Sequence, residues 1–241
     1  MTPQGAGSLN QDPRRLRTAR RDALLILAYY ALFMVYNSAV RESELLHWVT
    51  LVLLPLACGY IVARRRQRGG LREVLGSVGL RRGNLMRGVP LAVLLGVALS
   101  LLQLLVSNRS AAMWEMVVSG QIVLYLPLTL GLLFLTAGFT EEFFFRGVLQ
   151  TRLAVWWRRE APALLVAATL FGLYHFPYAY LLPSSPSHGE IGGALGECAY
   201  GALAGVIFGI VYWRSRRNLL AAVTVHVLIN ALPAMTMLRF D

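Results

Sequence analysis

The sequence predicts an all-α integral membrane protein, a bundle of about seven (seven to eight) transmembrane helices. Of its 241 residues, 56% are hydrophobic and only 15% are charged, whereas about 25% of the residues of a soluble domain are charged. Apolar runs of spanning length recur along the chain, and Glu141, His175 and His226 lie in or beside three of them. Such side chains are costly in hydrocarbon, so they mark a functional site by default.

Seven runs approach the roughly 20 apolar residues that a helix needs to cross a bilayer. They are Ala23–Val40, Leu45–Ala63, Val89–Val106, Gln121–Thr140, Ala161–Tyr180, Ile191–Trp213 and Leu219–Leu238. The fourth run continues helically to about Arg152. It is too long for one crossing, so we expect its second half to lie at the cytoplasmic rim or in a protein-lined cleft.

The basic residues predict the orientation. All 23 are arginines; 20 fall in segments on one side of the predicted spans and 3 on the other. Because cytoplasmic loops carry an excess of positive charge, this split places the N-terminus in the cytoplasm of a multi-pass protein of the cell membrane. The net charge of +11 thus follows membrane topology, and we expect the lipid bilayer, but no nucleic acid, as a partner.

The domain boundaries follow from composition. Residues 1–21 are rich in glycine, serine, proline, glutamine and arginine, which predicts a disordered basic cytoplasmic tail. Residues 22–241 are the predicted membrane domain. Its first helix should be retained, because no small-x-small cleavage site follows it. Later, Gly201, Gly205 and Gly209 recur at four-residue spacing, which predicts one helix face for close packing.

Two acidic residues and an arginine lie at the end of the fourth run. Glu142 and Arg146 are four residues apart, so a helix places them on one face in the favourable order for an ion pair. Glu141 points about 100° away and does not share this partner. One acid is therefore predicted to be structural and the other free to react, unless both are paired at the rim.

Two histidines and an amide lie in other runs. His226 and Asn230 are four residues apart and share a helix face, and His175 follows the fifth run. At 1.5 Å per residue, His226, Glu141 and His175 lie roughly 12, 16 and 21 Å from the cytoplasmic end. They can thus meet in one layer and form an intramembrane active-site cavity.

Two chemistries fit these groups. A glutamate near an imidazole can deprotonate water, while the other histidine and the amide stabilise an oxyanion, which amounts to amide hydrolysis. The same imidazoles and carboxylate could instead bind Zn²⁺ and activate a metal-bound water. No HExxH motif decides between them, and Cys58 and Cys198 add no zinc-binding spacing. A small transporter that uses these groups as a proton relay is a further alternative, although no internal repeat supports it.

Three motifs carry a family resemblance. They are EExxxR at Glu141–Arg146, FxxxH at Phe171–His175 and HxxxN at His226–Asn230. All three occur in order and resemble those of the CPBP intramembrane proteases, also called Abi, which include the Rce1-like CAAX prenyl endopeptidases. The resemblance covers a core at about residues 121–232. Glu197 matches no motif, and we expect it at a helix contact or at the outer rim.

The resemblance implies roles for the motif residues. Glu141 with His175 would activate the attacking water, and His226 with Asn230 would form the oxyanion site. The implied supporting residues are Glu142, Arg146 and Phe171. The substrate would be a membrane-associated peptide or protein, as in CAAX-type or bacteriocin processing. Two alternatives stay open. The protein could be a metalloprotease whose zinc is held by Glu141, His175 and His226, or it could be a non-catalytic protein of this fold that acts in immunity or as a scaffold.

Overall fold

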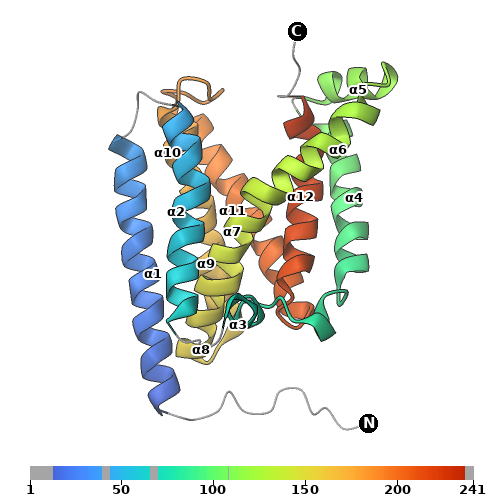
Figure 1. Cartoon of the computed structure of the whole chain (residues 1–241). Helices are drawn as coiled ribbons and strands as arrows, with labels where there is room; N and C mark the ends of the chain where they lie inside the picture. The colour runs from blue at the N-terminus through green and yellow to red at the C-terminus, as the bar shows by residue number, and fades with distance from the viewer. Residues whose placement is uncertain (1–12, 40–43, 66–69, 108, 237–241) are drawn as a thin grey trace.

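A computed structural model of the chain describes residues 13–39, 44–65, 70–107 and 109–236 (Figure 1). Every regular element in these ranges is helical, as the composition predicts. The first half contains α1 (Pro13–Ala39), α2 (Glu44–Arg64), α3 (Leu71–Ser77), a 3₁₀ turn η1 (Arg82–Asn84), α4 (Val89–Val106) and α5 (Ser110–Val118). The second half contains α6 (Ile122–Leu133), η2 (Phe134–Gly138), α7 (Phe139–Glu142), η3 (Phe143–Gln150), α8 (Thr151–Trp157), α9 (Glu160–Tyr174), α10 (Phe176–Leu181), α11 (Ile191–Arg214) and α12 (Leu219–Met235).

Helices of membrane-spanning length make up most of the bundle. Among the described residues, five are long and apolar enough to cross a membrane: Pro13–Ala39, Val89–Val106, Ile122–Trp157, Glu160–Leu181 and Ile191–Arg214. The other two predicted spans coincide with the shorter apolar helices Val49–Arg64 and Leu219–Met235. The 17 residues of α12 extend for only about 25 Å, less than the roughly 30 Å of a hydrocarbon core. A count of seven or eight spans therefore stays a prediction.

The N-terminal helix begins earlier than the sequence predicts. Residues 13–21 were assigned to a disordered tail, but α1 starts at Pro13, and proline suits the first turn of a helix. Ala19 is fully buried, and Arg20 lies over the ring of Trp156 at 5.8 Å. These contacts with α8 hold the segment in the bundle, so that part of the prediction is wrong. Residues 1–12 of the predicted tail lie outside the described residues.

The helix that carries the two glutamates is interrupted by wide turns. As predicted, the fourth run continues as one helical rod, over Ile122–Trp157. Within it, η2 and η3 are π-helical and leave only the four residues of α7 between them. Such wide turns in an α-helix occur most often at functional sites.

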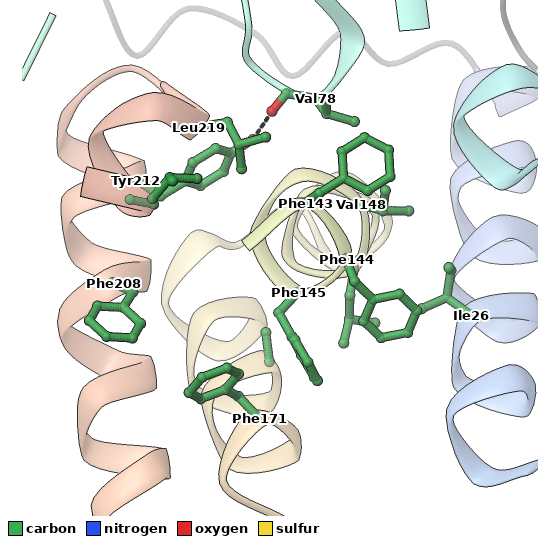
Figure 2. Packing of buried hydrophobic residues seen from close by; sticks show 14 of the residues in the cluster. Ile26, Val78, Phe143, Phe144, Phe145, Val148, Phe171, Phe208, Tyr212 and Leu219 are labelled. Carbon is green, nitrogen blue, oxygen red and sulfur yellow. Dashed lines mark hydrogen bonds between the residues drawn. The ribbon is translucent and has the colours of Figure 1, made fainter. Parts of the chain in front are cut away.

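An aromatic core surrounds this rod. Phe143, Phe144 and Phe145 are successive and all buried, because η3 is enclosed on every side (Figure 2). The Phe145 ring meets that of Phe171 on α9 edge to face, with centroids 5.1 Å apart. This contact joins the glutamate-bearing rod to the helix that ends at His175.

The predicted glycine face is a helix contact. Helix α11 packs along α9, and a Cβ on Gly205 would lie 3.0 Å from the Cα of Ala168. A Cβ on Gly209 would lie 2.8 Å from the side chain of Leu164. Small residues thus bring the two backbones together, as the four-residue spacing predicts.

The arginine-rich segments gather at one end of the bundle. The start of α1, the α3 segment, α8 and the turn between α11 and α12 all lie at the lower end in Figure 1, whereas α5 and α10 lie at the other. This agrees with the predicted alternation of the helices. Which end faces the cytoplasm stays a prediction.

Candidate active site

The neighbouring acids of α7 lie in different surroundings. The Glu142 side chain is fully buried, whereas 12% of the Glu141 side chain is exposed. The two carboxylates point in different directions because successive helical residues are rotated by about 100°. One acid is therefore enclosed by protein while its neighbour can meet water.

Glu142 is the centre of a buried ionic group. Its Oε1 accepts hydrogen bonds from Nη1 of Arg146 and Nδ1 of His226, each at 2.8 Å. Arg146 also donates through Nη2 to the backbone oxygen of Gly205 at 3.1 Å. The contacts tie three segments together: the EExxxR turn, α11 and α12. A charge pair buried this deeply is tolerated because both members are hydrogen-bonded.

Aromatic rings enclose this group. The guanidinium of Arg146 lies 4.3 Å from the centre of the Phe171 ring and 5.3 Å from that of Phe208. The His226 ring stacks on Phe208 at 4.6 Å with an interplanar angle of 14°. The rings exclude water and fix the imidazole plane, so the orientation of His226 is set by both packing and its hydrogen bond.

The other nitrogen of His226 faces the partly exposed acid. Its Nε2 lies 3.8 Å from Oε2 of Glu141. That separation is too long for a direct hydrogen bond. It is short enough for a water molecule beside both atoms to contact each of them.

His175 approaches the same region from α9. Its Nδ1 lies 2.8 Å from the backbone oxygen of Phe171. A carbonyl only accepts, so Nδ1 carries the proton, and Nε2 is an acceptor in the neutral ring. The ring also lies edge to face with Phe171, with centroids 5.0 Å apart, and Glu141 is within electrostatic range of it.

Asn230 lies one helical turn beyond His226 on α12. Its side chain is half-buried, and among the described residues its amide makes no hydrogen bond. His175 and Glu141 are half-buried too, whereas Glu142, Arg146 and His226 are buried. Glu141, His175 and Asn230 are therefore more accessible than the members of the buried ionic group.

A comparison with protein families identifies this region. Residues 123–232 match the family model of the type II CAAX prenyl endopeptidase Rce1-like proteins. The chain contains an Rce1-like domain. No curated protein and no solved structure gives a significant match to the chain. The match confirms the resemblance seen in the sequence, and at the level of the family it supports a CAAX-type intramembrane protease. With the apolar helices it indicates a multi-pass membrane protein.

The potential metal-binding side chains of the Rce1-like domain include Glu141, His175 and His226. No group of three or more His, Cys, Asp or Glu side chains in the described ranges has the geometry to hold a metal ion. His226 uses Nδ1 for Glu142 and His175 uses Nδ1 for Phe171, which leaves one nitrogen on each ring. Zinc held by Glu141, His175 and His226 therefore stays an alternative, and no step below uses a metal.

Two residues of the Rce1-like domain were missed by sequence reasoning. Phe208 stacks on His226, and the backbone oxygen of Gly205 receives Arg146. Both lie on α11, which carries none of the three motifs. The only sequence signal was the glycine spacing, which predicted a packed face but not what packs there. Glu197, also on α11, accepts a hydrogen bond from Ser187 at 2.6 Å.

The cavities described for the protein lie elsewhere. One, of about 620 Å³, is at the arginine-rich end, and the other, of about 420 Å³, is an apolar groove between α4, α6 and α12. Neither is lined by Glu141, His175 or His226. The predicted intramembrane active-site cavity therefore stays a prediction.

Proposed function

We propose that the protein is an intramembrane endopeptidase in which Glu141 and His175 activate water and His226 and Asn230 stabilise the oxyanion. The observation that carries the proposal is the 3.8 Å separation between Oε2 of Glu141 and Nε2 of His226. A water molecule beside both atoms can be deprotonated by the carboxylate and oriented by the imidazole.

The role of Glu141 as general base rests on its contrast with Glu142. Glu142 holds Arg146 and His226 through its Oε1, so proton uptake there would break the ionic group. Glu141 makes no comparably short contact among the described residues and is partly exposed. Its carboxylate can therefore take a proton without disturbing the fold.

His175 supports the same proton transfer. Because its Nδ1 donates to the oxygen of Phe171, the neutral ring presents Nε2 as an acceptor. A second acceptor near the attacking water helps to orient it and to hold the proton. The Phe171 carbonyl fixes the tautomer, as hydrogen-bonded partners of catalytic histidines commonly do.

His226 and Asn230 supply donors for the developing negative charge. Because Nδ1 of His226 donates to the buried carboxylate of Glu142, Nε2 can donate to an oxyanion in the doubly protonated ring. The Asn230 amide adds a neutral donor from the same helix face. Donors held in place before the reaction stabilise an oxyanion at no reorganisation cost.

The reaction then balances without further reactants. The water oxygen bonds to the peptide carbonyl carbon while its proton passes to Glu141, and the oxyanion forms against His226 and Asn230. The C–N bond breaks as Glu141 returns the proton to the amide nitrogen. The products are a carboxylate-ended peptide and an amine-ended peptide, and Glu141 is ionised again.

The test is peptide cleavage in proteoliposomes. Glu141→Gln, which keeps size but removes the base, should lose activity by about 10²- to 10⁴-fold. His175→Ala and His226→Ala should also lose activity. Glu197→Gln is the matched control, because this carboxylate contacts only Ser187 among the described residues, and it should remain active.

Because the family indicates a substrate class and not a particular protein, the substrate is sought by comparing the membrane proteomes of cells that carry wild type or Glu141→Gln. A peptide end present only with wild type identifies the cleavage site. Full activity of purified Glu141→Gln would remove the base from the mechanism and favour a non-catalytic protein of this fold.

A further inference from the structure

A cavity lined by arginines lies at the end of the bundle where α1, α8 and the turn between α11 and α12 meet. Its volume is about 620 Å³. The arginines that line it are Arg15, Arg81, Arg87, Arg152, Arg216 and Arg217. They come from four separate segments of the chain, so the cluster is made by the fold and not by one basic stretch.

The cavity is distinct from the proposed active site. Arg152 follows Glu141 by eleven residues, which corresponds to about 16 Å along the helical rod. The lining includes none of the residues to which the proposed function assigns a role. An inference about this cavity therefore does not depend on the proposed protease activity.

More arginines line the cavity than are paired with carboxylates of the described residues. Two of the arginines pair with acids: Arg152 with Asp22, at 3.4 Å, and Arg217 with Glu160. None of the described residues that line the cavity is an Asp or Glu. Arg15, Arg87 and Arg216 make no side-chain hydrogen bond or ion pair within the described residues. Like charges that share one cavity repel one another, and a bound anion reduces that repulsion.

The cavity wall also contains unusual backbone conformations. Arg216 and Arg217 are successive residues with φ of 54° and 58°, a conformation that costs about 1–3 kcal/mol in a residue other than glycine. Gly79, with φ of 108°, lies against this turn, and a Cβ there would fall 2.1 Å from the backbone oxygen of Arg217. Strained residues held by surrounding packing often form ligand clamps. Arg216 and Arg217 both line the cavity.

From this geometry we infer that the cavity binds a phosphate group. Guanidinium groups match phosphate oxygens in pairs and are weakly hydrated, so they bind phosphate better than other surface cations do. The arginine-rich end is where the positive-inside rule places the headgroup layer of the inner leaflet. The phosphate of an anionic phospholipid and free phosphate share this chemistry.

The experiment measures binding to the full-length protein in a phosphate-free detergent. The probes are dioctanoyl phosphatidylglycerol and inorganic phosphate, each titrated by calorimetry. The test variant is Arg15→Gln/Arg87→Gln/Arg216→Gln, which removes no side-chain hydrogen bond within the described residues. The matched control is Arg72→Gln/Arg159→Gln/Arg214→Gln. These exposed arginines lie at the same end and do not line the cavity.

The test variant should bind at least one probe about tenfold or more weakly than wild type, because each substitution removes a charge-assisted hydrogen bond to the phosphate. The control should stay within about twofold. Binding of phosphatidylglycerol alone identifies a lipid headgroup, and binding of both probes identifies phosphate in general. Equal weakening in the two variants, or no binding to wild type, overturns the inference. Unchanged thermal unfolding of both variants shows that a loss of binding is not a loss of fold.

Discussion

Nδ1 of His226 lies 2.8 Å from Oε1 of Glu142, a bond that joins α12 to the EExxxR turn across 84 residues of sequence. Because Nδ1 donates this hydrogen bond to Glu142, the other ring nitrogen, Nε2, points toward Glu141. One acid thus orients the imidazole and its neighbour meets the imidazole's other edge. The two adjacent acids therefore contact different nitrogens of one imidazole.

Removing either charge of the buried pair should destabilise the protein strongly. Glu142→Gln and Arg146→Gln each leave the partner's charge buried and uncompensated, at a cost of about 3–5 kcal/mol. Unfolding in mild detergent measures the effect. Glu190→Gln, at an exposed carboxylate, is the control and should change stability by about 0.5 kcal/mol or less. The double variant should lose less than the sum of the single losses, and simple additivity would show that the pair is not coupled.

Asn230→Ala should lower turnover without unfolding the protein. Its amide makes no hydrogen bond among the described residues, so its removal breaks no contact that holds the fold there. Loss of one oxyanion donor lowers kcat by about 10²- to 10³-fold. Steady-state cleavage kinetics separate kcat from KM. Gln103→Ala, which removes an amide that contacts Tyr200, should leave kcat unchanged. A pure rise in KM for Asn230→Ala would assign the amide to substrate binding instead.

Gly172→Ala should disturb both packing and catalysis. A Cβ at this position would fall 2.3 Å from the backbone oxygen of Cys198, so α9 must move away from α11. His175 directly follows the last residue of α9 and would move with it. Overpacking of this kind costs about 1–3 kcal/mol. Gly196→Ala is the matched control, since nothing lies within 4 Å of its Cβ. Thermal unfolding and cleavage rate are measured together. Equal behaviour of the two variants would mean that α9 and α11 do not pack this closely.

Chelation should leave the activity unchanged. The described residues do not bring three metal-binding side chains together, and the proposed steps use only a carboxylate, two imidazoles and an amide. Cleavage is measured after dialysis against a strong chelator and again after addition of Zn²⁺. The control is a zinc protease treated in the same way. Activity that falls on chelation and returns with zinc would favour the metal-bound water over Glu141.

Sequence spacing predicted the local geometry of the site. Glu142 meets Arg146 because residues four apart share a helix face, and the pairing persists although η3 is π-helical. The spacing of His226 and Asn230 likewise places them on one side of α12. The spacing did not predict that α1 begins at Pro13, because the contacts of Arg20 and Asp22 with α8 cannot be read from the composition of that segment.

The sequence by itself determined the helical class, the arginine-rich end, the pairs of residues on single helices and the Rce1-like motifs. These follow from hydropathy and helical period, which act within one segment. Only the tertiary structure decided that His226 bonds to Glu142 and faces Glu141, that Phe208 and Gly205 complete the ionic group, and that six arginines share a cavity. Such relationships depend on how closely distant helices pack. That distance is set by side-chain volumes across whole interfaces and not by spacing along the chain.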